Sequence, residues 1–155
     1  MNPLSMLNLE QAQRYLIGGV PQTRALGVRA REVTPARSVF ELPYDERLIG
    51  DPDSGVIHGG AITTLFDSVC GNAVLTGLRE LRRIVTLDLR IDYLRPARPR
   101  HSVICTGECY RYTHDVAFVR ATAHDGDPED LLATAAGTFV LLEPVTPEQM
   151  SKGIT

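Results

Sequence analysis

The sequence predicts an α+β fold in which a curled antiparallel β-sheet wraps around one long central helix. In the proline-free segment 59–75, apolar residues recur at the three- and four-residue spacing of a helix. Strand-like segments lie on both sides of this helix in the chain, two before it and four after it. Strands from both sides need an apolar surface to cover, and the helix between them supplies that surface.

The central helix is expected to be surrounded by protein. Most positions outside its apolar stripe are small and uncharged, which is typical of a helix buried on all sides. Asp67 is the exception, because a carboxylate is costly to bury without a partner or a task. Asp67 is therefore a candidate functional residue. The apolar stripe consists of Ile62, Leu65, Phe66, Val69, Ala73 and Leu75.

Glycines mark the start of this helix. Gly55, Gly59 and Gly60 permit a sharp turn and let a ligand approach the main chain closely. The first N–H groups of a helix lack internal acceptors and lie at the positive end of its dipole, so this end favours a polarised carbonyl or an oxyanion. Asp67 follows Gly59 by eight residues, about 12 Å along the axis. The two groups can therefore serve one small reacting centre only if they come from two copies of the chain.

Size and composition restrict the class of protein. The chain of 155 residues is long enough for one domain with its own core, and we assign residues 1–155 to a single domain. A net charge of −3, with both signs interspersed, argues against a nucleic-acid partner or an anionic membrane. Three cysteines without CxxC spacing are typical of a reduced intracellular protein. With neither a membrane-length apolar run nor a secretion signal, we expect a soluble cytoplasmic protein.

A short helix, a hairpin and a loop are expected before the central helix. Asn8 and Gln11 match a capping box, so the short helix begins there. Two extended segments flank Pro35 and predict the hairpin. The polar stretch that follows predicts a loop. These elements are expected at residues 8–17, 26–33, 38–43 and 44–54.

The strand at residues 84–94 has the clearest pattern after the helix. Odd positions from Val85 to Tyr93 are apolar and alternate with polar ones, so the apolar face is expected to pack on the helix. Thr86 falls on the opposite, charged face. The tail after Glu143 is expected to be loose. Further strands are expected at residues 102–112, 116–124 and 131–142.

Two motifs mark the helix start and the strand after the helix. The first is Gly-Val-Ile-His-Gly-Gly at residues 55–60, and Asp67 follows its histidine, His58, by nine residues. The second is Val-Thr-Leu-Asp-Leu at residues 85–89, which leads to Tyr-Leu-Arg-Pro-Ala at residues 93–97. In this combination the chain resembles the hotdog-fold acyl-CoA thioesterases of the PaaI-like, or phenylacetyl-CoA thioesterase-like, group.

This resemblance covers residues 26–142, most of the chain. It implies a single hotdog thioesterase domain that hydrolyses an acyl-CoA thioester to free acid and CoA. No cofactor is implied, because CoA is part of the substrate. The resemblance also implies a homodimer, and often a homotetramer, whose site lies between two subunits.

The resemblance assigns roles position by position. Asp67 would act as the general base on water or attack the thioester directly. The N–H of Gly59 would hold the thioester carbonyl, and His58 would help to position that carbonyl or the loop. Thr86 would orient the attacking water.

Further residues are candidates for contact with the substrate. Gly60 belongs to the His-Gly-Gly motif, and Leu65 and Phe66 would form pocket walls together with the partner chain. Arg95 and Arg98 could bind the CoA phosphates, although a solvated basic turn is the better account of them. The remaining histidines lie on different strands without ligand spacing, and the cysteines suit small core positions, so no metal site is expected.

One position departs from the family pattern and leaves alternatives open. Many relatives have an asparagine six residues before the histidine, where this chain has Pro52, which cannot replace the hydrogen bonds of a side-chain amide. Asp67 could also be a structural carboxylate in a non-catalytic acyl-CoA-binding hotdog domain. Gly50 and Asp51 ahead of His58 give weaker support to an enoyl-CoA hydratase-type enzyme.

Overall fold

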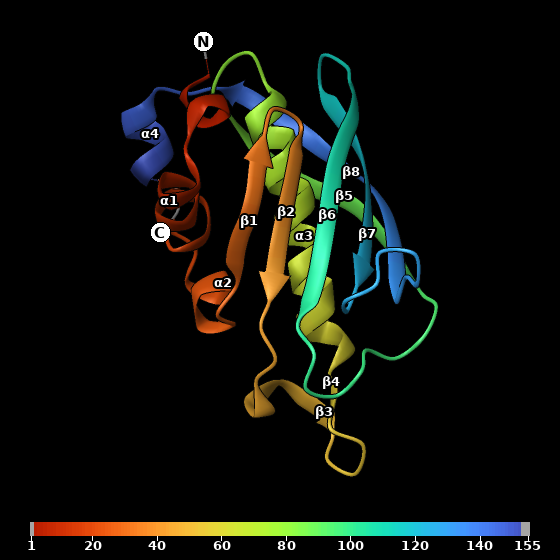
Figure 1. Cartoon of the computed structure of the whole chain (residues 1–155). Coiled ribbons are helices and arrows are strands. Elements are labelled where there is room, and N and C mark those ends of the chain that lie inside the picture. Colours follow the sequence, from red (N-terminus) through yellow and green to blue (C-terminus); the bar gives the residue numbers. More distant parts are fainter. Residues whose placement is uncertain (1, 153–155) are drawn as a thin grey trace.

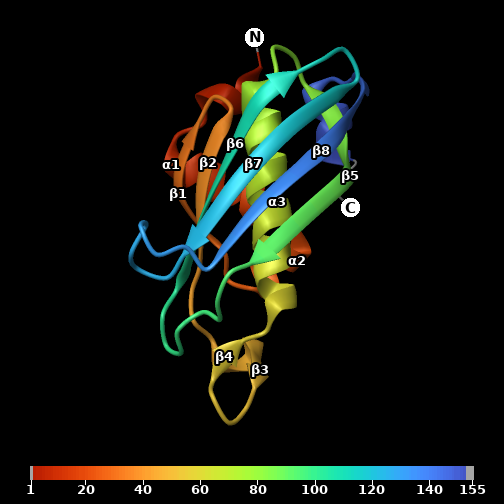
Figure 2. The ribbon, with the colours of Figure 1, turned by 90° about the vertical axis from the view of Figure 1, so that its right-hand side faces the viewer.

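A six-stranded antiparallel sheet curls around one long helix, α3 (Gly59–Gly77), as Figures 1 and 2 show. The computed structural model describes residues 2–152, with side chains for residues 2–150. The predicted α+β architecture is confirmed. Part of the tail after Glu143, residues 153–155, lies outside the described residues.

The strand order of the sheet is β1-β2-β6-β7-β8-β5, so β1 and β5 form its two edges. The N-terminal hairpin joins the later strands through the pairing of β2 with β6. All predicted strands are found within a few residues of their expected ends. They are β1 (Arg29–Thr34), β2 (Arg37–Leu42), β5 (Arg82–Tyr93), β6 (Val103–Tyr112), β7 (Val116–His124) and β8 (Ala133–Pro144).

One face of α3 forms the centre of the core, where Leu65, Phe66 and Val69 are fully buried against the sheet. The expectation that protein surrounds this helix on all sides is wrong for the single chain. Thr63 and Asp67 are exposed, because the sheet covers only the apolar stripe and leaves the opposite face open. The three cysteines are buried among the core residues, as predicted.

The N-terminal segment packs along the edge strand β1. The predicted capping box is confirmed, with Asn8 and Gln11 each accepting from the other's backbone N–H. Gln13 then anchors the segment: its Oε1 accepts from the Ala30 N–H at 2.7 Å. The expected helix at 8–17 is divided into α1 (Leu9–Ala12) and the π-helical η2 (Gln13–Ile17), and two further elements occur, η1 (Pro3–Met6) and α2 (Pro21–Ala25).

The predicted alternation along β5 is wrong at its beginning. Val85 and Leu87 are 52% and 63% exposed, whereas the Thr86 side chain bonds to α3. The register of β5 against β8 shifts between Thr86 and Asp88, which is a β-bulge. Because the extra residue exchanges the two faces, Thr86 before the bulge and Leu89 after it both face the helix.

Gly137 of β8 makes room for this bulge. A Cβ at this position would lie 2.5 Å from the carbonyl oxygen of Asp88, so any other residue would force the backbone of one strand to shift. Gly137 pairs with Leu89 in the register of the two strands. A lone glycine within a strand pattern is a known signal of a bulge, so this correction was accessible from the sequence.

Two segments expected to be irregular contain regular structure. The predicted loop holds η3 (Glu46–Leu48) and a small sheet of β3 (Ile49–Asp51) with β4 (Val56–Ile57), which extends beyond the start of α3 in Figures 1 and 2. The tail expected to be loose forms α4 (Pro147–Lys152). Thr146 and Gln149 cap that helix reciprocally, a capping box that the sequence already displays.

Candidate functional site

His58 caps the N-terminus of α3. Its backbone is extended and its Nδ1 accepts the N–H of Gly60 at 2.9 Å. Since Nδ1 acts as acceptor, the neutral ring carries its proton on Nε2. Gly50 allows β3 to pass close by, because a Cβ there would lie 2.8 Å from the Cα of His58.

The Gly59 N–H has no acceptor among the described residues. The neighbouring amides are used, since Gly60 donates to the His58 ring and Ala61 to the His58 carbonyl. Gly59 therefore presents an open donor at the positive end of α3, as the prediction requires. The predicted contact of Gly60 with substrate stays untested, and its N–H is already engaged by His58.

Tyr93 at the end of β5 braces the first turn of α3. Its hydroxyl donates to the Gly59 carbonyl at 2.8 Å and lies 2.9 Å from the Thr63 hydroxyl. Sequence reasoning assigned no role to Tyr93, although it begins the Tyr-Leu-Arg-Pro-Ala motif. These bonds fix the orientation of the peptide beside the open amide.

Asp67 projects from the exposed face of α3, and Thr86 holds it. The Thr86 hydroxyl donates to the Asp67 Oδ1 at 2.8 Å. The structure therefore brings these two predicted residues together, with Thr86 on the helix-facing side of β5. In the described part of the chain no cation pairs with Asp67, so its other lone pairs remain available to a water or a substrate.

The two halves of the predicted site are separated within one chain. Since α3 runs unbroken from Gly59 to Gly77, the Gly59 amide and the Asp67 position are about 12 Å apart along the axis. One protomer does not bring the open amide and the carboxylate to the same small group.

A cavity of about 360 Å³ adjoins the amide end of α3. Leu65 and Phe66 do not line this cavity, because both are fully buried in the core. They can affect its shape only by supporting the residues that do line it. The cavity is lined by Gln22, Leu26, Arg47, Leu48, Ile49, His58, Gly60, Ala61 and Thr64.

Arg95 and Arg98 are bound to a carboxylate rather than free. The Arg95 guanidinium donates to both oxygens of Asp125 at 2.8 and 3.0 Å, and the Arg98 guanidinium donates to Oδ1 at 2.8 Å. The hydrogen bonds from Arg95, followed by those from Arg98, hold the pKa of Asp125 far below its usual range despite burial. Much of the positive charge is thereby neutralised, which weakens the predicted role in binding phosphates.

Pro52 lies exposed in the turn between β3 and β4. The polar groups beside it bond within the turn, where the Ser54 hydroxyl and the Asp53 N–H both donate to Asp51. Asp51 and Ser54, the polar neighbours of Pro52, are thus bonded to each other within the turn. Among the described residues, no group of three His, Cys, Asp or Glu side chains could hold a metal ion. None of the described helices has the length and apolar character to cross a membrane.

Comparison with known proteins places this geometry in a family. The thioesterase superfamily model matches residues 54–132. The medium/long-chain acyl-CoA thioesterase YigI of Salmonella typhimurium is 30% identical over 154 residues, covering 88% of this chain and 98% of that protein.

Solved structures agree with the sequence relatives. A Pseudomonas aeruginosa protein of known crystal structure is 40% identical with a TM-score of 0.76, covering 89% of this chain and 98% of that one. A variant of the phenylacetic acid degradation protein PaaI from Thermus thermophilus is 25% identical with a TM-score of 0.69, covering 79% of this chain and 99% of that one. The predicted resemblance is confirmed.

Proposed function

Because the chain belongs to the thioesterase superfamily, we propose that it hydrolyses acyl-CoA thioesters, using Asp67 and the Gly59 amide as its working groups. Thioester hydrolysis is the reaction class of this enzyme family. The similarity to an acyl-CoA thioesterase over almost the whole of that protein supports CoA as the thiol. The finer proposal rests above all on the Asp67 carboxylate, which Thr86 orients and which no cation among the described side chains neutralises.

Hydrolysis requires a polarised carbonyl and an activated water. The Gly59 N–H donates to the thioester oxygen and stabilises the negative charge that develops on it. Asp67 accepts a proton from water as the water oxygen bonds to the carbonyl carbon. The C–S bond then breaks, CoA leaves as a thiolate that takes up a proton, and the acid is released. Direct attack by Asp67, with water cleaving the resulting anhydride, gives the same products.

The separation of the two groups implies a site shared by two protomers. Edge strand β5 carries exposed apolar side chains at Val85 and Leu87, and an unpaired edge of this kind favours pairing with a second chain. The open face of α3 next to it is lined with small residues. A two-fold dimer would form two equivalent sites, each with Asp67 of one protomer and the Gly59 amide of the other.

The Gly59 amide is tested by two substitutions, of which one removes the N–H and the other keeps it. Gly59→Pro removes the donor at the first helical position, where proline is well tolerated. Gly59→Ala keeps the donor, and its Cβ would meet only the Tyr93 hydroxyl and ring, at ordinary distances of 3.5 to 3.8 Å. With thiol release from a panel of acyl-CoAs as the assay, the proline variant should lose about 10²–10³ in kcat and the alanine variant little. Equal activity of the two variants would rule out the amide's role.

The shared site is tested by mixing two inactive variants. Asp67→Asn chains co-refolded with Gly59→Pro chains form mixed dimers that contain one intact site. Random exchange makes half of the dimers mixed, so activity should recover to about a quarter of the wild-type value. A mixture no more active than its parts, or a chain that stays monomeric at assay concentration, contradicts the shared site.

A further inference from the structure

We propose that the cavity beside the first turns of α3 binds the acyl chain of the substrate, and that α2, η3 and β3 set the chain length accepted. This inference rests on the proposed function, because it takes the thioester carbonyl to lie at the Gly59 amide. The cavity holds about 360 Å³ and is walled by Gly60, Ala61 and Thr64 on the side of α3.

The position of the cavity suits a substituent of the reacting carbonyl. Gly60 and Ala61 directly follow Gly59 in the helix, and His58 precedes it, so the cavity begins within one residue of the open donor. A carbonyl that accepts from Gly59 therefore places one of its two arms at the mouth of this cavity. The Asp67 position lies further along the helix and outside the lining.

The lining favours an uncharged chain. Leu26, Leu48, Ile49 and Ala61 supply the apolar part of the lining, beside polar residues such as Gln22 and Thr64. The one cation of the lining, Arg47, is held by Asp45 through Nε at 3.1 Å and Nη2 at 2.6 Å. Because this ion pair offsets the charge of Arg47, we expect alkyl or aryl acyl groups to be preferred over dicarboxylic ones.

The size of the cavity indicates which part of the substrate it holds, the acyl group or CoA. At about 30 Å³ for each water-sized group, 360 Å³ accommodates about a dozen such groups, enough for an acyl chain of medium length. The other arm, CoA, carries phosphates and a nucleotide that need solvent and cations. The acyl arm is therefore the better occupant.

The walls opposite α3 come from parts of the chain outside the family match. Gln22 and Leu26 belong to the α2 region, and Arg47, Leu48 and Ile49 to η3 and β3, all before the matched residues 54–132. Gln22 Nε2 also donates to the Thr64 hydroxyl at 3.4 Å and links the two sides. The carbonyl-binding end thus lies within the matched family model, whereas the walls that would limit the chain length precede it in the sequence.

Two substitutions alter the cavity in opposite directions. Ala61→Leu fills it and preserves helix propensity, whereas Leu26→Ala enlarges it. Leu9→Ala, in the exposed part of α1 and outside the lining, is the matched control for loss of a leucine side chain. The probes are CoA itself and S-alkyl-CoA thioethers of increasing length, which cannot be hydrolysed, with Kd measured by titration calorimetry.

Affinity of the wild type should rise with each added methylene, by up to about fourfold, until a limiting length is reached. The limit should shorten in Ala61→Leu, lengthen in Leu26→Ala and stay unchanged in Leu9→Ala, while CoA alone binds all four proteins equally. An identical limit in all four overturns the inference. So does weaker binding of CoA alone to Ala61→Leu with an unchanged limit, which would place the pantetheine arm in the cavity. Absence of thiol release from acyl-CoAs would refute the proposed function instead, and the thioether series would still decide what the cavity binds.

Discussion

Two carboxylates of this chain, Asp67 and Asp125, occupy opposite environments. Asp125 is 2% exposed and bound by the guanidinium groups of Arg95 and Arg98. Asp67 is exposed on α3 and accepts one hydrogen bond, from the neutral hydroxyl of Thr86. Their different partners give the two carboxylates different chemistry.

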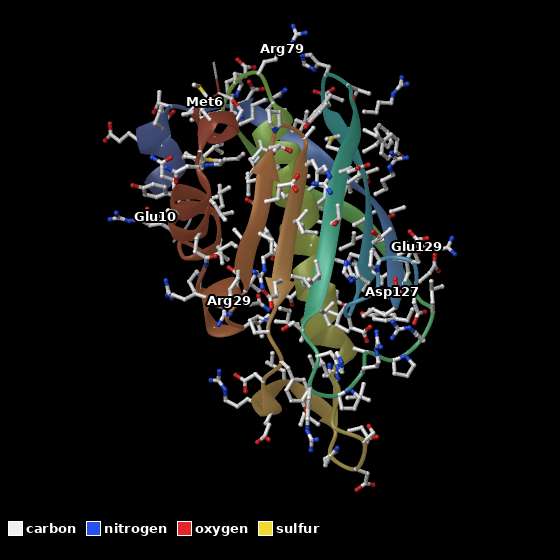
Figure 3. All side chains as sticks on the ribbon, viewed as in Figure 1. Met6, Glu10, Arg29, Arg79, Asp127 and Glu129 are labelled. Atoms are coloured by element: carbon white, nitrogen blue, oxygen red, sulfur yellow. The ribbon has the colours of Figure 1, made fainter. Side chains whose placement is uncertain are left out.

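The difference shows how a structural carboxylate is told apart from a reactive one. The Asp125 oxygens are occupied by donors, which ties the segment after β5 to the turn between β7 and β8. Asp127 and Glu129 of the same turn are exposed and lie at the periphery in Figure 3. Asp67, by contrast, is oriented without being neutralised, so it can still accept a proton.

The largest expected effect is on turnover, in Asp67→Asn. Removal of a general base typically costs 10²–10⁴ in kcat, and the exposed position predicts little change in melting temperature. Asp125→Asn should show the reverse pattern, with a lower melting temperature and near wild-type kcat in the folded fraction. Thiol-release kinetics together with thermal unfolding check both halves. Normal turnover in Asp67→Asn would contradict the assignment of Asp67 as the catalytic carboxylate.

The next effect is on stability, in Asp125→Asn. Loss of this charge leaves Arg95 and Arg98 facing each other around a buried amide, and breaking such a pair costs about 3 kcal/mol of unfolding free energy. Asp127→Asn in the same turn is the control, because its exposed side chain only accepts from the Glu129 N–H, and an amide oxygen can do the same. Urea unfolding of both variants measures the difference. Equal midpoints would show that the two arginines contribute no net stability.

A smaller effect should appear in acid. The arginines lower the pKa of Asp125 in the folded chain below the value of about 3.9 expected when unfolded. Its contribution to stability is therefore complete above about pH 4 and is lost as the pH falls below that value, because the unfolded chain then binds the proton more readily. Unfolding free energies measured between pH 6 and pH 2.5 should fall less steeply below about pH 4 in Asp125→Asn than in the wild type.

Some features around Asp67 could be predicted from the sequence, and others could not. The helix start, Asp67 and the succession of strands along the chain follow from local patterns of glycine, capping and alternation, which one chain segment displays by itself. The bond from Thr86 to Asp67 was not predictable from alternation, because the bulge at Leu87 exchanges the faces of β5. Gly137, far away in the sequence, was its one signal.

The pairing of Arg95 and Arg98 with Asp125 was missed for a related reason. A contact across 30 residues depends on how two turns meet, and neither turn contains a pattern that specifies its partner. Basic residues in a turn are usually interpreted as solvent-exposed charges. The sequence alone could not show that a buried carboxylate binds these two. In both cases, the missed feature is a long-range contact between side chains of well-predicted elements.

The smallest effect should come from substitution of Thr86. These variants test the orientation of the Asp67 carboxylate while leaving the carboxylate itself in place. Thr86→Val keeps the shape and strand propensity but removes the hydroxyl that donates to Asp67 at 2.8 Å. A lost hydrogen bond to a charged group predicts a decrease of about tenfold in kcat, because the carboxylate remains but samples unproductive orientations. Thr86→Ser restores the donor and should recover most of the activity with an unchanged KM. If valine and serine act alike, the hydroxyl does not orient the base, and Asp67 must then be positioned by the partner protomer instead.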